Sequence, residues 1–276
     1  MMDLTSVTSN LEQHSDGIWY ARQHSPIDYP EEGNTFCYGV EEGSFWFNHR
    51  NAFILEALHR YPPSGLLFDV GGGNGYVAKA IQLSGIDTVL IEPGIEGIKN
   101  AHLRGLHQLV CATLQDAKFT PHSLPAVGIF DVLEHIENDE GFLATLDELM
   151  VSGGRLYITV PAYNWLWSIE DEFAQHYRRY TLSELKEKLN QAGFRIEFST
   201  YIFASLPLPI FLFRTIPSKF GLRKQGDLKR VESELRPVSN TTNRMLNKIL
   251  RFELWLLRTF NTLPFGGSCL VVARSN

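Results

Sequence analysis

The sequence lacks the marks of several protein classes. Its three cysteines, Cys37, Cys111 and Cys269, are far apart and form neither a metal-binding nor a disulfide spacing, so we expect a reduced protein of the cytoplasm. The N-terminus has no basic region followed by an apolar core, so we expect no secretory signal. Lys and Arg number 25 against 31 Asp and Glu, and this acidic balance argues against broad electrostatic binding to nucleic acid.

The composition that is present fits a globular chain. With 276 residues, 44% of them hydrophobic and 20% charged, the chain can bury a sizeable core, as one elaborated domain or as one domain with an insertion. Residues 1–35 are polar and rich in turns, and we expect about the first fifteen to be poorly ordered.

A glycine-rich loop between an apolar strand and a helix is the feature around which the other motifs are arranged. Residues 66–70 are apolar apart from Asp69, which predicts a buried strand, and a helix is expected over 76–81. The backbone between them has to turn tightly beneath a ligand, which glycine permits. The residues of this loop that we assign to the ligand are Asp69, Gly71, Gly73, Asn74 and Gly75.

Three interpretations of this loop compete, and one of them is a plain turn. A dinucleotide fingerprint, G-x-G-x-x-G/A, needs a third small residue where Tyr76 stands here. The pattern D-x-G-x-G-x-G instead resembles motif I of the class I S-adenosylmethionine (SAM) methyltransferases. The resemblance implies that Asp69 helps to hold the amino acid part of SAM and that the glycine backbone leaves room for the ligand.

An acid at the end of a second apolar strand is the expected ribose ligand. Residues 88–92 form this strand, and Glu92, followed by Pro93, lies 17 residues beyond Gly75. A carboxylate at this place can accept hydrogen bonds from both ribose hydroxyls.

Two further strand ends complete the expected cofactor site. The strand over 109–112 leads to Thr113 and Leu114, where the resembled family holds adenine. Many relatives have an aspartate at this strand tip and this chain does not, so we expect adenine to be recognised by backbone groups and Leu114. The strand over 126–130 ends in Phe130 and Asp131, which resemble the family's motif after its fourth strand.

Alternating strands and helices over residues 66–160 predict βαβ units and a parallel sheet. The expected fold class is α/β: a Rossmann-like, seven-stranded, mostly parallel sheet with helices on both faces and an antiparallel last strand. Ligands of such sheets bind beyond the carboxyl ends of the strands. The remaining expected elements are helices over 52–58, 96–104, 140–151 and 185–191, the last opened by a capping box at Thr181 and Glu184, and strands over 155–160, 194–198 and 269–273.

Other stretches resemble a bacterial branch of SAM methyltransferases, so that the resemblance covers nearly the whole chain. They lie at residues 45–46, 133–135 (Leu-Glu-His), 176–185 and 264–268. The domain division that we expect is an N-terminal segment and precore helix over 1–60, a SAM-binding core over 61–200, a helical insertion over 201–264 and the last strand over 265–276.

Methyl transfer from SAM needs mainly the alignment of donor and acceptor, because SAM carries its own leaving group. A base is needed only for a protonated acceptor. His135 and His176 are the candidate catalytic residues, because both follow strand ends at the rim of the expected site and should face the same crevice. The alternative is that His135 packs or caps its own helix and His176 orients a loop. Asp131-x-x-Glu134-His135 with His176 also resembles the set by which small-RNA 2′-O-methyltransferases hold a divalent ion. A divalent metal is therefore a second expectation, although Asp131 replaces that family's first Glu.

About 70 residues separate the last two expected strands, which a minimal fold would join by a short turn. The apolar segment 201–213 is too short and too rich in proline to cross a bilayer. Residues 245–258 have apolar side chains at helical spacing with Lys and Arg between them. Two roles are open and can coexist: a lid over the acceptor pocket, or peripheral contact with a membrane through residues 201–260.

The expected function is therefore transfer of a methyl group from SAM to a small-molecule or to a lipid- or glycan-linked acceptor, most simply at oxygen. A non-catalytic SAM-binding module and an NAD-dependent oxidoreductase are the alternatives, and Tyr76 in the loop weighs against the oxidoreductase. The sequence does not identify the acceptor.

Overall fold

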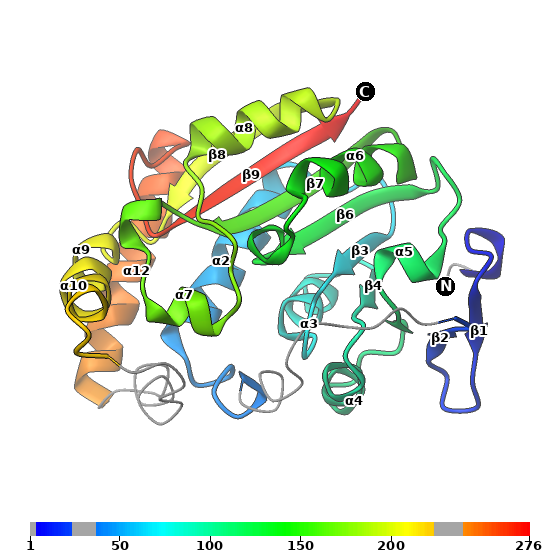
Figure 1. The fold of residues 1–276 in the computed structure, drawn as a ribbon, viewed down its shortest axis with the longest axis horizontal. Helices are drawn as coiled ribbons and strands as arrows, with labels where there is room; N and C mark the ends of the chain where they lie inside the picture. The colour runs from blue at the N-terminus through cyan, green and yellow to red at the C-terminus, as the bar shows by residue number, and fades with distance from the viewer. Residues whose placement is uncertain (1–3, 24–36, 224–239) are drawn as a thin grey trace.

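The computed structural model describes residues 4–23, 37–223 and 240–276. A single nine-stranded sheet runs through them in the order β1-β2-β5-β4-β3-β6-β7-β9-β8 (Figure 1). Its five central strands pair in parallel, as the βαβ pattern predicts. They are β3 (Leu67–Val70), β4 (Thr88–Ile91), β5 (Leu109–Cys111), β6 (Leu124–Phe130) and β7 (Met150–Pro161).

The last strand of the chain lies inside the sheet. β9 (Ser268–Ser275) is inserted between β7 and β8 (Phe194–Ile202) and is antiparallel to both. Its alternate side chains enter different hydrophobic cores: Val271 packs on one face of the sheet and Val272 on the other. A strand buried on both faces has to be apolar at successive positions, which explains the uninterrupted run 269–273. The expected fold class, with its antiparallel last strand, is confirmed.

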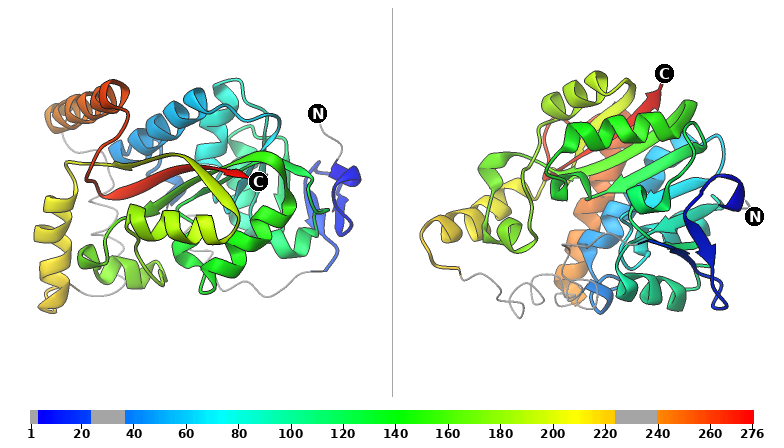
Figure 2. Two further views of the ribbon diagram at one scale, coloured as in Figure 1. Left: turned by 90° about the horizontal axis from the view of Figure 1, so that it is seen from above. Right: turned by 45° about the vertical axis from the view of Figure 1, so that its right-hand side comes forward.

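Helices cover both faces of the sheet (Figure 2). On one face the helices are α5 (Leu114–Ala117), α6 (Asp139–Leu149) and α8 (Leu182–Gln191). On the other face they are α2 (Phe45–Arg60), α3 (Tyr76–Leu83), α4 (Ile95–Leu103) and α12 (Asn240–Phe260). The predicted capping box of α8 is present, because Thr181 and Glu184 each accept a hydrogen bond from the other's backbone N–H.

The N-terminal segment corrects two expectations. Residues 4–23 are ordered: η1 (Leu4–Ser6) leads to a hairpin of β1 (Leu11–Gln13) and β2 (Trp19–Ala21), and β2 pairs in parallel with β5. The hairpin adds two strands to the seven that we predicted. It is held by Leu4 and Leu11, which are buried in the core, and by Asn10, whose side-chain amide donates to the Asp116 carbonyl at 2.6 Å.

Several element boundaries also differ from the expected ones. α2 begins at Phe45, seven residues before the predicted start at residue 52. α6 ends at Leu149 and β7 begins directly at Met150, where we predicted two more helical residues and a strand that starts only at residue 155. β8 continues to Ile202 because Thr200 to Ile202 pair with β9, so the first two residues of the expected insertion belong to the sheet.

The insertion between β8 and β9 is helical where it is described. It contains α9 (Pro207–Ile210), a π-helical turn η4 (Phe211–Thr215), α10 (Ile216–Lys219) and α12. These helices lie at the end of the molecule away from the N-terminal hairpin (Figures 1 and 2). No helix in the described part of the chain has both the length and the apolar character needed to cross a bilayer.

Candidate functional site

The loop between β3 and α3 adopts the tight conformation that its glycines predict. Gly71, Gly73 and Gly75 all have positive φ angles, of 71°, 54° and 71°. A Cβ atom on Gly75 would lie 2.5 Å from the Leu106 Cδ1 atom. A side chain at this position is therefore excluded by backbone strain and by lack of space.

Asp69, at the end of β3, is fully buried, and neither of its carboxylate oxygens has a hydrogen-bond partner of ordinary geometry among the described residues. Burial raises the pKa of Asp69 to about 7, with Glu92 adding to the rise and Arg50 opposing it. An unpartnered buried acid is stabilised in its charged form by a cationic ligand beside it. This environment is compatible with the predicted role toward SAM.

Glu92 joins β4 to the glycine loop. Its Oε2 accepts a hydrogen bond from the Gly73 N–H at 2.9 Å, and its Oε1 accepts one from the Gly94 N–H at 2.8 Å. A carboxylate oxygen has two lone pairs, so these bonds leave capacity for ligand hydroxyls. Pro93 follows, and its carbonyl accepts a bond from the Cys111 thiol.

Three other predicted cofactor residues make structural contacts. The Asn74 side chain is buried, donates to Glu41 and accepts from Asn100, and so ties the loop to its neighbours. Thr113 caps α5 by accepting from the Asp116 N–H, and Leu114 is buried in the core. Their part in holding a ligand stays a prediction.

Asp131, directly after the buried Phe130, is oriented by two partners. It has a left-handed backbone with φ of 57°, and its Oδ1 accepts a hydrogen bond from the Thr159 hydroxyl at 3.1 Å. Its Oδ2 forms an ion pair with Arg50 of α2, whose guanidinium lies 4.7 Å from the centre of the Trp46 ring. Asp131 is therefore already paired with a cation inside the protein.

His135 and His176 lie in contact, although 41 positions separate them in the sequence. Their ring centres are 4.7 Å apart in an edge-to-face arrangement. Both line a pocket of about 550 Å³ beyond the carboxyl ends of β6 and β7, together with Asp131, Glu134 and Pro161. The structure thus brings the two predicted catalytic histidines into one pocket, as we expected; their chemical roles stay predictions.

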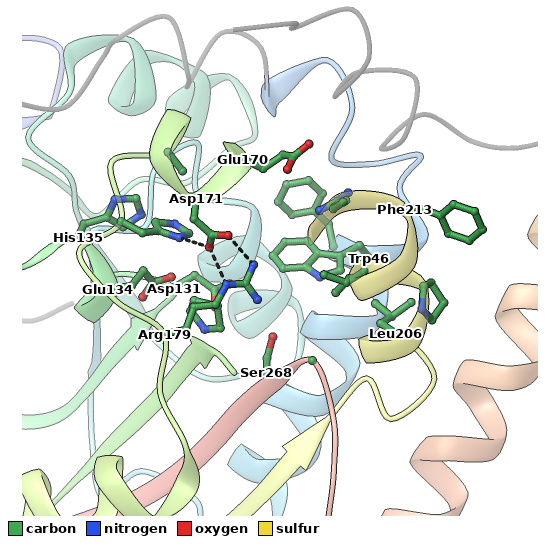
Figure 3. A pocket seen from close by; sticks show the side chains of 18 of the residues that line it. Trp46, Asp131, Glu134, His135, Glu170, Asp171, Arg179, Leu206, Phe213 and Ser268 are labelled. Atoms are coloured by element: carbon green, nitrogen blue, oxygen red, sulfur yellow. Dashed lines mark hydrogen bonds and ion pairs between the residues drawn. The ribbon is translucent and has the colours of Figure 1, made fainter. Parts of the chain in front are cut away.

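An acid that we did not predict orients His176. Asp171 of α7 (Ile169–Phe173) is buried and its Oδ1 lies 2.9 Å from His176 Nδ1, while Arg179 donates to both of its oxygens at 2.7 and 2.9 Å (Figure 3). Burial alone would raise the pKa of Asp171, but the hydrogen bonds and charges of His176 and Arg179 outweigh it and hold the pKa at about 2. An ionised Asp171 can only accept, so Nδ1 of His176 is the donor and Nε2 carries the lone pair when the ring is neutral.

We did not predict a role for Asp171 because its contacts with His176 and Arg179 form only in the folded structure. It lies five residues before His176, and we assigned it no role. The spacing Asp171, His176, Arg179 is the signal that could have found it, because an acid, a histidine and an arginine this close in sequence can fold onto one another.

Burial shifts the pKa values of Glu134 and His135. Burial raises the pKa of Glu134 well above its usual value, and the charge of Asp131 raises it further; its Oε2 has no hydrogen-bond partner in the described structure. Burial, with the charge of His176 next in size, lowers the pKa of His135 to about 4. His135 is therefore neutral near pH 7.

These groups also fit a divalent metal. One ligand atom each from Glu134, His135 and His176 lies within 4.8 Å of the others. A neutral imidazole, a second imidazole held at Nδ1 by a carboxylate, and an unpartnered buried carboxylate are a normal donor set. Asp131 is not in this group, since its oxygens are held by Arg50 and Thr159.

The other half of the pocket is mostly apolar, although Arg214 of η4 also lines the pocket. Figure 3 shows Trp46, Leu206 and Phe213 across the pocket from Glu134, His135 and Asp171. Ile210 of α9 lines the same wall. The ligand that this pocket would fit has a polar end and an apolar end.

Comparison with known proteins places this site in context. A family model described as "Methyltransferase domain" matches residues 46–197. No curated protein sequence matches the chain. The folds of several solved structures are similar. One is the Haloferax volcanii partner of the Trm112 methyltransferase activator, with TM-score 0.57, 16% identity, and 91% of this chain and 97% of that chain covered.

Two further structures share the fold. Phosphoethanolamine N-methyltransferase 2 of Haemonchus contortus, in complex with SAM, has TM-score 0.54 and 16% identity, and 90% of this chain and 58% of that chain are covered. Geranyl diphosphate C-methyltransferase of Streptomyces coelicolor A3(2) has TM-score 0.52 and 11% identity, with 82% and 75% covered.

Proposed function

The chain belongs to the methyltransferase domain family, and from that premise we propose that it transfers a methyl group from SAM to the polar end of an amphipathic acceptor bound in the pocket of His135 and His176. It is a SAM-dependent methyltransferase; the acceptor class is our proposal. The observation that carries the acceptor proposal is the division of one pocket into an ionisable half and an apolar half.

The cofactor is S-adenosylmethionine, and structural neighbours of the same fold were solved with SAM or S-adenosylhomocysteine. The residues that we propose to hold it are those at the carboxyl ends of β3 to β6. In this assignment Asp69 provides negative charge, the glycine loop provides space, and Glu92 accepts the ribose hydroxyls. Thr113, Leu114 and Phe130 are assigned to the adenine side, with Asp131 between the cofactor and the pocket.

We assign the proton transfer to His176, with His135 beside it. For a hydroxyl acceptor, the oxygen forms its bond to the methyl carbon while the carbon–sulfur bond breaks, and the acceptor proton passes to Nε2 of His176. Asp171 stabilises the resulting imidazolium through Nδ1, at 2.9 Å. The products are the methyl ether and neutral S-adenosylhomocysteine.

A divalent metal is a second assignment for the same groups. Bound by Glu134, His135 and His176, such an ion would polarise an acceptor oxygen. The metal assignment is tested with chelators. If protein shown to contain no metal keeps its full activity, the metal assignment is wrong and only the assignment of a histidine base remains.

The apolar half of the pocket favours a lipid-linked acceptor over a small polar one. Leu206, Pro209, Ile210 and Phe213 of the insertion line this half, together with Arg214, and their position supports a role of the insertion as a lid. A lipid-linked acceptor has to be reached at a bilayer, so we include peripheral membrane contact through residues 201–260 in the proposal.

The first test is the choice of cofactor. We expect calorimetry to show binding of SAM and S-adenosylhomocysteine and no binding of NAD. Gly73→Val should abolish binding, because Gly73 has φ of 54° and its N–H donates to Glu92. Gly85→Val, at a loop glycine with φ of 90° and open space around it, is the control for backbone strain. Normal SAM binding by Gly73→Val would place the cofactor elsewhere.

A further inference from the structure

The outer surface of the helical insertion is unusually apolar for a face exposed to water. Sixteen large hydrophobic side chains are exposed in the described structure, and ten of them lie between residues 208 and 265. On α12, Leu250, Glu253 and Leu257 are buried, while Phe252 and Trp255 are 58% and 53% exposed. A helix on a soluble protein normally presents polar residues on its outer face. A cluster of exposed aromatic residues of this kind is typical of an interaction surface.

Charge distinguishes the insertion from the rest of the chain. Residues 204–264 contain eleven Lys and Arg against four Asp and Glu, although the whole chain has a formal charge of −6. The acid of α12, Glu253, is buried and accepts a hydrogen bond from the Ala204 N–H, so it does not offset the exposed cations. Lys248 and Arg251 are exposed one helical turn before Phe252 and Trp255, on the same outer face. The combination suits a partner that is both apolar and anionic.

The apolar surface continues into the pocket. Phe213 is 67% exposed and also lines the pocket wall, where Figure 3 shows it at the apolar side. Leu212, next to it, is exposed as well. α9, η4 and α10 lie at the same end of the molecule as α12 in Figure 1 and in the left view of Figure 2, which also shows them on opposite sides of that end. A ligand chain leaving the pocket along Phe213 would emerge at this surface.

From these observations we propose that the insertion docks on an anionic lipid bilayer and presents the pocket mouth to it. We call this the docking surface. Its members are the exposed apolar residues Leu212, Phe213, Phe220, Leu222, Met245, Phe252, Trp255 and Phe260 and the exposed cations Lys219, Lys248 and Arg251. Aromatic and aliphatic side chains enter the headgroup boundary while Lys and Arg contact anionic headgroups. The inference rests on the proposed function for the identity of the acceptor, but not for the contact itself.

Vesicle sedimentation tests the docking surface. We expect the full-length protein to bind vesicles of phosphatidylcholine with phosphatidylglycerol much more tightly than vesicles of phosphatidylcholine alone, and to be released by salt. Lys248→Gln with Arg251→Gln should weaken binding by about 30-fold, because each cation near such a surface contributes about 1 kcal/mol. Phe252→Ser with Trp255→Ser should weaken it by at least as much.

Matched controls separate docking from folding. Leu83→Ser and Leu103→Ser replace apolar side chains that are 75% and 73% exposed outside the insertion, and should leave vesicle binding unchanged. All variants should bind SAM as the wild-type protein does, as measured by calorimetry. If the wild-type protein itself did not bind SAM, the proposed function would be wrong, but the docking proposal would be unaffected. No binding to anionic vesicles at low salt, equal binding to both kinds of vesicle, or binding that survives both double substitutions overturns the docking proposal. A surface made for a protein partner would give the first of these results.

Discussion

Asp69 combines a proposed ligand-binding position with a buried carboxyl group whose charged form burial disfavours. Its pKa of about 7 lies well above its unfolded value, so the folded state keeps a proton that the unfolded state has already lost. The stability associated with this proton is present at pH below about 4 and is lost as the pH rises to about 7. Without ligand, the folded protein is therefore less stable above about pH 7, where Asp69 is charged and could bind the cationic SAM.

We therefore expect Asp69→Asn to stabilise the ligand-free protein at pH 8 by up to roughly 4 kcal/mol, with little effect at pH 4.5. The same substitution should weaken SAM binding, because the negative charge is gone. Urea unfolding at the two pH values and calorimetry with SAM measure both effects. Asp87→Asn, at an exposed acid before β4, is the control. If Asp69→Asn destabilised the protein equally at both pH values, the prediction would be wrong, and Asp69 would be ionised and stabilised by partners in the folded state.

In the proposed function, Asp171 acts on catalysis through His176. Asp171→Asn should lower the turnover number at least tenfold, because His176 is no longer fixed with its lone pair on Nε2. It should also destabilise the fold by about 3 kcal/mol, because Arg179 is left buried without its ionic partner.

Affinity separates these two effects. If Asp171→Asn acts through His176, SAM affinity stays near that of the wild type while turnover falls, and the pH dependence of turnover shifts. Glu172→Gln, at the exposed neighbouring position, should change neither quantity. A parallel loss of SAM affinity and turnover would reduce Asp171 to a purely structural role.

The N-terminal hairpin covers an edge that would otherwise be open. β2 pairs with β5, the outermost strand of the parallel sheet, and β1 in turn pairs with β2. β1 and β2 are three residues long each, so the new edge is short. Short edge strands resist pairing with other molecules.

Removal of residues 1–23 should accordingly promote self-association. The deletion exposes the backbone of β5 together with the core positions that Leu4 and Leu11 fill. We expect light scattering to rise at concentrations at which the full chain stays monodisperse. As a comparison, Asn10→Ala removes the side-chain bonds to the Asp116 carbonyl and, at 3.4 Å, to the Gln23 carbonyl, and should cost about 1 kcal/mol without association. A truncated chain that stays monodisperse would mean that β5 is protected in another way.

The elements that the sequence predicted are those with strong local signals. β3 to β7 alternate with helices, and the predicted capping box at Thr181 and Glu184 is present, although α8 begins at Leu182 and not at the predicted residue 185. The hairpin was not predictable in this way, since its strands depend on contacts with β5 and α5 far along the chain. We predicted the start of α2 seven residues too late, because residues 45–51 are a mixture of aromatic and polar residues without a clear helical periodicity.

The same reasoning separates the predicted from the unpredicted parts of the site. His135 and His176 were predicted to meet because each follows a strand end, and parallel strands bring such ends to one edge. Two ion pairs of the site were not predicted: Asp131 with Arg50, and Asp171 with Arg179. They depend on side-chain geometry, which the periodicity of the sequence does not reveal. Leu114 was assigned to adenine from its place after β5, yet its side chain is buried in the core.

In the whole molecule, the insertion and the sheet depend on one another. α12 contributes Leu250 and Leu257 to the core that α2 covers, and Arg258 forms an ion pair with Glu56 of α2. The insertion is therefore more than a removable lid: its inner face completes the fold, while its outer face forms the docking surface. Substitutions of single exposed residues are for this reason a cleaner probe of its function than deletion.

The position of β9 between β7 and β8 also determines the order in which the protein can be completed on the ribosome. β7 and β8 are synthesised first and have no pairing with each other; β9 joins them only after the insertion has been made. At about 5–20 residues per second, that interval is on the order of several seconds. During this time the edges of β7 and β8 that pair with β9 are open, and the two hydrophobic cores to which β9 contributes are incomplete.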